Sequence, residues 1–231
     1  MSNKYDELEK SIGYVFKDKG NLETALTHKS FANEKTCVKF ESYERYEFLG
    51  DAILEFLTSK YLFDNYPDKT EGELTKLRAS LVCEFTLSKI SRELNLGQYG
   101  RFSKGEKNTG GMNRDSILCD MFESLLGAIY LDGGMDQAKK FVETFLLTDI
   151  EHKQLFYDAK SMLQEYAQKQ DKVLLYNLIE ETGPDHSKEF KVQVMMDDKS
   201  GAIGVGHSRK AAEQMAAYNT LYALQQKTTL L

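Results

Sequence analysis

The sequence predicts an all-α domain followed by a small α+β domain, in which a three-stranded antiparallel sheet lies between two helices in the order α-β-β-β-α. Up to about residue 152, apolar residues recur at every third or fourth position, as in helices that bury one face. After about residue 157, a stretch appears in which apolar and polar residues alternate, as in a half-buried strand. These two periodicities predict two separate hydrophobic cores.

The first domain is predicted to consist of helical segments separated by three breaks. The breaks contain the glycine and proline residues that are typical of turns and loops. The middle break is also rich in lysine and is long enough to be an extended loop. The helical segments are 21–31, 50–63, 73–94 and 115–132, and the breaks are 65–72, 97–113 and 132–134.

The second domain is predicted from five shorter segments. Within its middle strand the inward-facing residues are expected to be Phe190, Val192, Val194 and Met196. Helices on one face of a small sheet are the natural packing for this order of elements. No linker rich in glycine, proline or serine separates the domains, so a short joint is expected near 152–157. The segments are a helix at 159–170, strands at 173–181, 189–197 and 202–206, and an alanine-rich helix at 208–225.

The composition limits the classes of protein that fit. Hydrophobic residues make up 41%, which allows a real core, and no run is long and apolar enough to span a membrane. The polar N-terminus lacks the apolar core of a signal peptide, so a cytoplasmic protein without a membrane partner is expected. The net charge of −6 means that any nucleic-acid binding must depend on local basic clusters. The widely separated Cys37, Cys83 and Cys119 form no Cys-x-x-Cys pair, which argues against zinc and disulfides.

An acidic stripe interrupts one of the most apolar helical segments. Glu44, Glu47 and Asp51 are spaced by three and four residues, which places them on one side of a helix. Asp120 and Glu123 form a second such pair on another apolar segment. No lysine or arginine stands three or four residues from any of these acids. Their charge must therefore be neutralised from elsewhere in the fold or by a metal ion.

Carboxylates clustered without histidine or cysteine suit a hard divalent cation, Mg²⁺ or Mn²⁺, better than zinc. A solvated acidic face and salt bridges between helices remain open as alternatives. A di-iron site would require Glu-x-x-His motifs, and none of His28, His152, His186 and His207 has a glutamate three residues before it. Gly50, set among the acids, indicates either close helix packing or room for a ligand beside Asp51, and Gly127 follows the second pair in a similar way.

Several blocks of this sequence resemble bacterial ribonuclease III. The strongest is ERYEFLGDA at 44–52, joined in the right order by ALTHKSFANE, EGELTKLRASLV and SILCDMFESLLGAIYLDGG. Two further blocks, DAKSMLQEYAQ and HSRKAAEQMAA, resemble the ends of a double-stranded-RNA-binding domain. Tyr46 departs from the leucine or methionine usual in the signature, and Arg209 replaces a lysine with its charge kept.

The resemblance implies a helical endonuclease domain at 1–153 and a double-stranded-RNA-binding domain at 157–228. It implies an Mg²⁺-dependent homodimer, with Mn²⁺ as a substitute, that hydrolyses double-stranded RNA to 5′-phosphate and 3′-hydroxyl ends. The expected substrates are precursors of ribosomal RNA, together with some messenger, transfer and structured RNAs. By resemblance, the magnesium ligands are Glu47, Asp120 and Glu123, the catalytic acids are Asp51 and Glu123, and further acids lining the cleavage valley are Glu44 and Glu71.

Local features of the second domain suit RNA. Arg209 and Lys210 stand in the first turn of the last predicted helix, after Ser208 as an expected N-cap. A phosphate at that helix end would be bound by the backbone N–H groups and both cations, although two solvated basic residues would look the same. By resemblance, the minor-groove contacts are Gln164, Glu165 and His186. Phe48 is by resemblance a candidate dimer-interface residue, with simple core packing as the alternative.

Two other functions compete with the endoribonuclease. A binding module could keep the fold without the chemistry, but the complete set of acids argues against it. A helical metal-storage or redox protein would bind iron and have no affinity for RNA.

Overall fold

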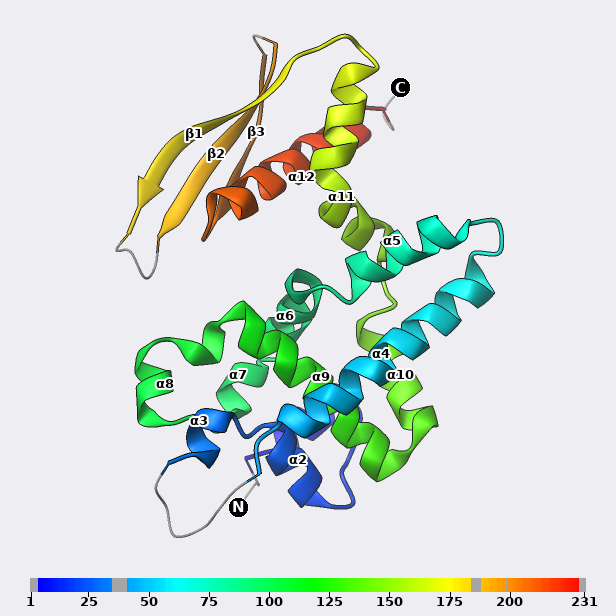
Figure 1. Cartoon of the computed structure of the whole chain (residues 1–231), viewed down its shortest axis with the longest axis vertical. Coiled ribbons are helices and arrows are strands. Elements are labelled where there is room, and N and C mark those ends of the chain that lie inside the picture. The colour runs from blue at the N-terminus through cyan, green and yellow to red at the C-terminus, as the bar shows by residue number, and fades with distance from the viewer. Residues whose placement is uncertain (1–3, 35–40, 184–187, 198, 229–231) are drawn as a thin grey trace. The chain divides into compact units, whose positions relative to one another are not determined.

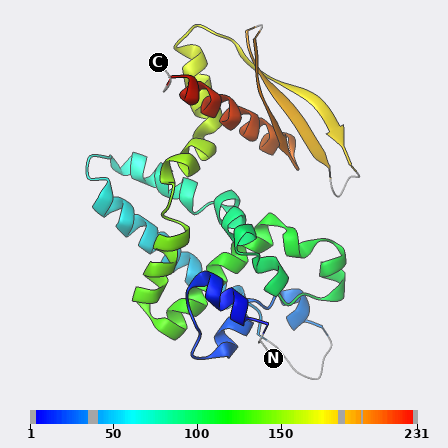
Figure 2. The ribbon, with the colours of Figure 1, turned by 180° about the vertical axis from the view of Figure 1, so that it is seen from behind.

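The computed structural model describes residues 4–34, 41–183, 188–197 and 199–228, with side chains described as far as residue 225 (Figures 1 and 2). The chain forms two compact units, Met1–Ile150 and Glu151–Leu231. The first is helical, and the second contains a three-stranded sheet flanked by helices in sequence. The predicted fold class is therefore confirmed.

In the first unit, helix α9 lies at the centre and packs against α2, α4, α6 and α10 (Figure 1). Most of α9 is buried, including Phe122 and Met121, which have no exposed surface. The elements are α1 (Asp6–Ile12), α2 (Lys19–Ala25), α3 (Lys29–Ala32), α4 (Glu44–Asn65), α5 (Glu71–Leu81), α6 (Glu84–Glu93), α7 (Leu96–Tyr99), α8 (Lys104–Asn108), the 3₁₀ helix η1 (Gly111–Asn113), α9 (Asp115–Gly133) and α10 (Met135–Phe145).

Two of the three breaks that the sequence predicts separate helices in the structure. The break that contains Pro67 is closed by a capping box in which Thr70 and Glu73 exchange hydrogen bonds at the start of α5. Gly134 adopts a φ of 81° between α9 and α10. The expectation of one long loop at 97–113 was wrong, because α7, α8 and η1 occupy most of it. Ser103 caps α8 by accepting a hydrogen bond from the Glu106 N–H at 3.1 Å.

Helices α4 and α9 cross at two glycines. A Cβ atom on Gly50 would overlap the backbone carbonyl of Glu123, and one on Gly127 would overlap that of Tyr46. Of the two uses considered for Gly50, close helix packing is the one that the structure supports. The crossing brings the acid-bearing faces of both helices to the same place.

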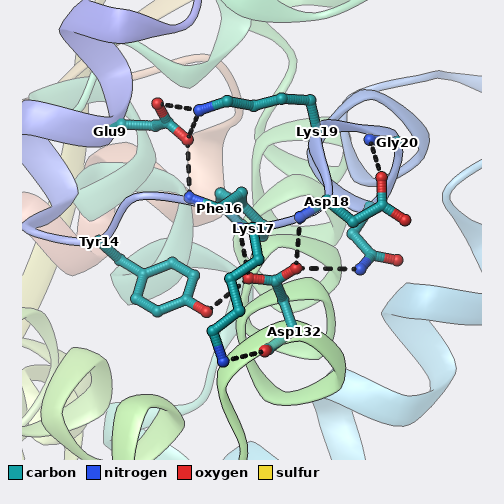
Figure 3. Close-up of polar contacts among 9 residues, drawn as sticks. Glu9, Tyr14, Phe16, Lys17, Asp18, Lys19, Gly20 and Asp132 are labelled. Carbon is teal, nitrogen blue, oxygen red and sulfur yellow. Dashed lines mark hydrogen bonds and ion pairs between the residues drawn. The ribbon is translucent and has the colours of Figure 1, made fainter.

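The end of α9 is tied to the start of the chain through Asp132, as Figure 3 shows. Its carboxylate accepts a hydrogen bond from the Tyr14 hydroxyl at 2.6 Å. It also accepts hydrogen bonds from the backbone N–H groups of Lys17 and Asp18, each at 2.9 Å. Asp132 therefore holds residues from more than 110 positions away against the central helix.

The second unit has the predicted order of elements, with strands β1, β2 and β3 joined as an antiparallel sheet in that order (Figure 1). Val192 and Val194 on β2 are fully buried, as the alternation predicted, and Val194 packs with Leu163 and Ala216 from the two helices. The elements are α11 (Ile150–Gln168), β1 (Leu174–Thr182), β2 (Glu189–Met196), β3 (Lys199–Gly206) and α12 (Arg209–Thr228). The stretch 152–157, expected to be a short joint, is instead part of α11.

None of the described helices combines the length and the apolar character that crossing a membrane requires.

Candidate metal centre and nucleic-acid interface

Three carboxylates from the two crossing helices meet at one point. Glu47 on α4 and Asp120 and Glu123 on α9 each offer one oxygen, and these oxygens all lie within 4.8 Å of one another. The Gly50–Gly127 contact makes this possible, because it lets the backbones approach where larger residues would hold them apart. The two acidic stripes of the sequence therefore form one cluster.

Burial and mutual repulsion disfavour the charged forms of these acids. Burial, followed by the charges of Asp120 and Glu44, raises the pKa of Glu47 to about 7. Burial, followed by the charges of Asp51 and Glu47, raises the pKa of Glu123 to about 8. The pKa of Asp120 is also raised, chiefly by burial. The nearby Lys29 lowers the pKa of Glu47 and that of Asp120 without reversing either shift, so the cluster is short of positive charge.

The donor set fits a divalent cation of the hard class. All three groups supply carboxylate oxygen, which Mg²⁺ and Mn²⁺ prefer, and the cluster is half-buried, so water can complete the coordination. A bound cation would also supply the positive charge that the cluster lacks. Solvated acidity explains the raised pKa values of Glu47 and Glu123 less well, because solvated carboxylates keep pKa values near 4.

One hydrogen-bond donor at the cluster was not predicted. The Tyr43 hydroxyl donates to Asp120 Oδ2 at 3.0 Å, and the Tyr43 side chain is only 3% exposed. The one sequence signal for Tyr43 is its position directly before Glu44, at the N-terminus of the acidic helix.

The other predicted acids, among the described residues, are not members of this three-residue cluster. Asp51 is exposed one turn further along α4, and its charge acts on both Glu47 and Glu123. Glu44 is exposed and accepts a hydrogen bond from Ser42 at 3.0 Å, with Lys29 at 3.5 Å. Glu71 stands at the start of α5, where it lines a groove of about 680 Å³ between α4 and α5 and accepts a hydrogen bond from Thr75. Within the described residues, Glu71 is not part of the metal-binding group.

Phe48 does not pack in the core. It is 81% exposed on α4, and Phe56 and Phe63 are exposed at 57% and 72%. Their spacing of eight and seven residues places all three on one face of the helix. The core-packing alternative for Phe48 is therefore wrong.

In the second unit, the predicted basic helix end is present. The Ser208 hydroxyl accepts a hydrogen bond from the Ala211 N–H at 3.1 Å, as expected for an N-cap, and Arg209 and Lys210 are exposed. Sequence reasoning missed Glu213, which binds Arg209 at 3.1 Å and Lys160 of α11 at 2.6 Å.

The predicted minor-groove residues divide into two groups. Gln164 and Glu165 are both exposed on α11, where a ligand could reach them. His186 lies outside the residues that the structure describes.

Comparison with known proteins agrees with both units. A family model described as "Ribonuclease-III-like" matches residues 18–150, and one for the double-stranded RNA binding motif matches residues 159–224. The chain is 45% identical to Ribonuclease 3 of Clostridium perfringens, covering 94% of this chain and 93% of that protein. It is 44% identical to Ribonuclease 3 of Oceanobacillus iheyensis, covering 93% and 95%. A crystal structure of the ribonuclease III nuclease domain from Campylobacter jejuni matches with a TM-score of 0.58 and 42% identity, covering 63% of this chain and 95% of that one.

Proposed function

The chain belongs to the ribonuclease III family, and on that premise we propose how it cuts RNA. It is an endoribonuclease that carries a double-stranded-RNA-binding motif. We propose that it hydrolyses double-stranded RNA with Mg²⁺, or Mn²⁺ as a substitute, and leaves 5′-phosphate and 3′-hydroxyl ends. The single observation that carries this proposal is the convergence of carboxylate oxygens from Glu47, Asp120 and Glu123 within 4.8 Å.

We assign Glu47, Asp120 and Glu123 as ligands of the cation. When bound, the cation would lower the pKa of a water molecule and stabilise negative charge on the reacting phosphate. Asp51, exposed beside the cluster, is assigned to orient the attacking water and accept its proton. In the balanced reaction, the water oxygen forms a bond to phosphorus, the bond from phosphorus to the 3′-oxygen breaks, and the 3′-oxygen takes up a proton. Glu123 has two assigned roles, as ligand and as catalytic acid, and Glu44 lines the cleavage valley.

The decisive experiment is incubation of the full chain with a long perfect RNA duplex, with and without Mg²⁺, followed by analysis of the product ends. Metal-dependent cleavage to 5′-phosphate ends is the expected result. Binding without cleavage at any divalent concentration would support a non-catalytic binding module instead. Tight iron binding without RNA affinity would support the metal-storage alternative.

For RNA binding we assign the Arg209–Lys210 pair at the start of α12 to phosphate and Gln164, Glu165 and His186 to the minor groove. The N-terminus of α12, capped by Ser208, presents backbone N–H groups beside these two exposed cations. Each phosphate contact steepens the salt dependence of affinity, by about 0.9 in the slope of log affinity against log salt for B-DNA. The Arg209→Ala, Lys210→Ala double variant should therefore bind duplex RNA more weakly and with a slope shallower by up to about 2. An unchanged slope would remove both residues from the interface.

We further propose that the chain acts as a homodimer through its helical domain. The exposed phenylalanine face of α4, Phe48, Phe56 and Phe63, is apolar enough to support an interface. A second copy would also give Glu71, which is not part of the acid cluster among the described residues of its own chain, a place in the cleavage valley of the other copy. A related nuclease domain from Campylobacter jejuni is described as having a flexible region involved in dimer formation.

Sedimentation tests the dimer. The native chain should sediment as a dimer at micromolar concentration, and Phe48→Lys should shift it toward monomer and reduce cleavage of both strands. A monomeric native chain with full double-strand cleavage would contradict the proposal.

We also propose domain limits of 1–153 and 157–228, a cytoplasmic location, and precursors of ribosomal RNA together with some messenger, transfer and structured RNAs as substrates.

A further inference from the structure

We propose that Tyr43 is a positioning residue that orients Asp120 toward the catalytic cation. The inference rests on the proposed function, in which Asp120 is a metal ligand. The observation behind it is the hydrogen bond from the Tyr43 hydroxyl to Asp120 Oδ2 at 3.0 Å, made by a side chain that is 3% exposed.

Contacts made by the backbone and the ring of Tyr43 hold its hydroxyl in place. Its backbone N–H donates to the carbonyl of Thr27 at 2.9 Å. Its ring lies 5.7 Å from the ring of His28, which is itself buried. The backbone N–H of His28 in turn donates to the carbonyl of Arg101 at 3.0 Å. A donor anchored in this way is restricted in position, so it can orient its acceptor.

A carboxylate that binds a metal needs such a partner. Asp120 can rotate about its side-chain bonds, and a hydrogen bond to one oxygen fixes the carboxylate plane and the direction of the lone pairs that remain. In the part of the chain that the structure describes, Tyr43 is the one side chain that donates a hydrogen bond to Asp120. Groups in this relation to a metal ligand typically contribute 10- to 100-fold to metal affinity or activity.

The test is the Tyr43→Phe variant, which removes only the hydroxyl. Direct binding of Mn²⁺ to the full chain without RNA, measured by calorimetry, should weaken by about tenfold. The cation concentration for half-maximal cleavage should rise by a similar factor, while the single-turnover rate at saturating cation should stay close to native. Binding of duplex RNA without divalent cation should not change.

Tyr46→Phe is the matched control. Tyr43 directly precedes α4, and Tyr46 lies in its first turn, is half-buried, and donates its hydroxyl to Asn21 Oδ1 at 2.9 Å, away from the cluster. It therefore loses an equivalent hydrogen bond without touching a proposed ligand. Equal loss of Mn²⁺ affinity in both variants would overturn the inference, because the effect would then come from general loosening of the fold.

Asp120→Asn separates failure of this inference from failure of the proposed site. If Asp120→Asn binds Mn²⁺ as tightly as the native chain, the ligand assignment itself is wrong. If it loses affinity while Tyr43→Phe does not, the site stands and the positioning role falls. If Tyr43 acts through Asp120, the double variant should bind Mn²⁺ no more weakly than Asp120→Asn alone, whereas independent effects would multiply.

Discussion

Helix α9 carries two carboxylate sites that are supplied with hydrogen-bond donors in opposite ways. Near its C-terminal end, Asp132 accepts hydrogen bonds from Tyr14, Asn21 and two backbone N–H groups (Figure 3). Near its N-terminal end, the side-chain donors that the described residues supply to the acid cluster are the Tyr43 hydroxyl, on Asp120, and a weak thiol contact from Cys119, on Glu123. One helix therefore holds an acid satisfied by the protein and acids left for something else to satisfy.

The pKa values at the two sites are shifted in opposite directions. Partial burial alone would raise the pKa of Asp132, but the hydrogen bonds from Tyr14 and the backbone outweigh it and lower that pKa to about 2. At the other site, burial and neighbouring charges raise the pKa of Glu123 to about 8. An acid close to a protein's core is therefore not by itself a sign of function. The sign is a deficit of donors and cations that the fold could have supplied.

The contrast between Asp132 and the acid cluster is tested most strongly by replacing one acid at each site with its amide. Glu123→Gln should reduce cleavage of duplex RNA by about 100-fold or more, since a direct ligand should matter at least as much as the residues that support it. Binding of the duplex should be largely kept, because affinity comes mainly from phosphate contacts elsewhere. Asp132→Asn should leave the single-turnover rate near native. Near-native cleavage by Glu123→Gln at saturating Mg²⁺ would show that the functional site has been assigned to the wrong end of α9.

Stability should respond in the reverse sense. Asp132→Asn should lower the free energy of unfolding by about 2 kcal/mol at pH 7, because hydrogen bonds to a charged acceptor are lost. Glu123→Gln, measured without divalent cations, should leave the stability unchanged or raise it, since Glu123, with a pKa of about 8, is already mostly protonated at pH 7 and glutamine carries no charge that the cluster would oppose. Urea unfolding of both variants measures the two effects. A loss of stability in both would mean that the two sites do not differ as proposed.

The affinity for the cation should rise with pH between 6 and about 8.5. In the metal-free chain, Glu47 and Glu123 hold protons up to pKa values of about 7 and 8, and a cation must displace these protons to bind. The expected gain is about tenfold per pH unit for each proton displaced. The same shifts make the metal-free chain less stable as pH rises. The folded-state pKa values lie above the ordinary value of 4.5, so the stabilisation by protonation is complete below pH 4.5 and is lost as pH rises through 7 and 8. Calorimetric titration with Mn²⁺ across this range checks the slope, and a flat profile would contradict it.

The smallest effect is expected in acid. The folded pKa of Asp132, about 2, lies below the ordinary aspartate value of 3.8, so its contribution to stability is present above about pH 4 and is lost as pH falls toward 2. The difference in unfolding midpoint between the native chain and Asp132→Asn should therefore shrink over that interval. A difference that stays constant would mean that Asp132 stabilises the fold by packing and not by its charge.

Sequence reasoning recovered the fold class because periodicity is a local property. The alternation at Val192 and Val194 and the cap at Ser208 can each be read within a few residues. The prediction of a loop at 97–113 was wrong because it followed the glycines and lysines of this stretch. Ser103 is a local helix signal within it, and it caps α8.

The candidate site was only partly predictable. The acidic stripes are visible in the sequence, but their meeting point depends on the crossing of α4 and α9, which is a tertiary contact between residues more than 70 positions apart. Tyr43 was missed because a tyrosine before a helix has many uses, and its role appears only once Asp120 stands opposite it. The Lys160–Glu213 ion pair likewise joins two helices, α11 and α12, whose paired residues lie more than 50 positions apart in the sequence.

The paired glycines at the α4–α9 crossing have a consequence for how this sequence can vary. Every coding change at Gly50 or Gly127 that alters the amino acid adds at least a Cβ atom, and that atom would overlap a backbone carbonyl of the opposite helix. A backbone carbonyl cannot rotate away as a side chain can, so compensating changes nearby would have to move a whole helix. In a saturation library selected for folded protein, these two positions should therefore return glycine alone, while the exposed Phe48 two residues from Gly50 should accept many substitutions when folding alone is selected.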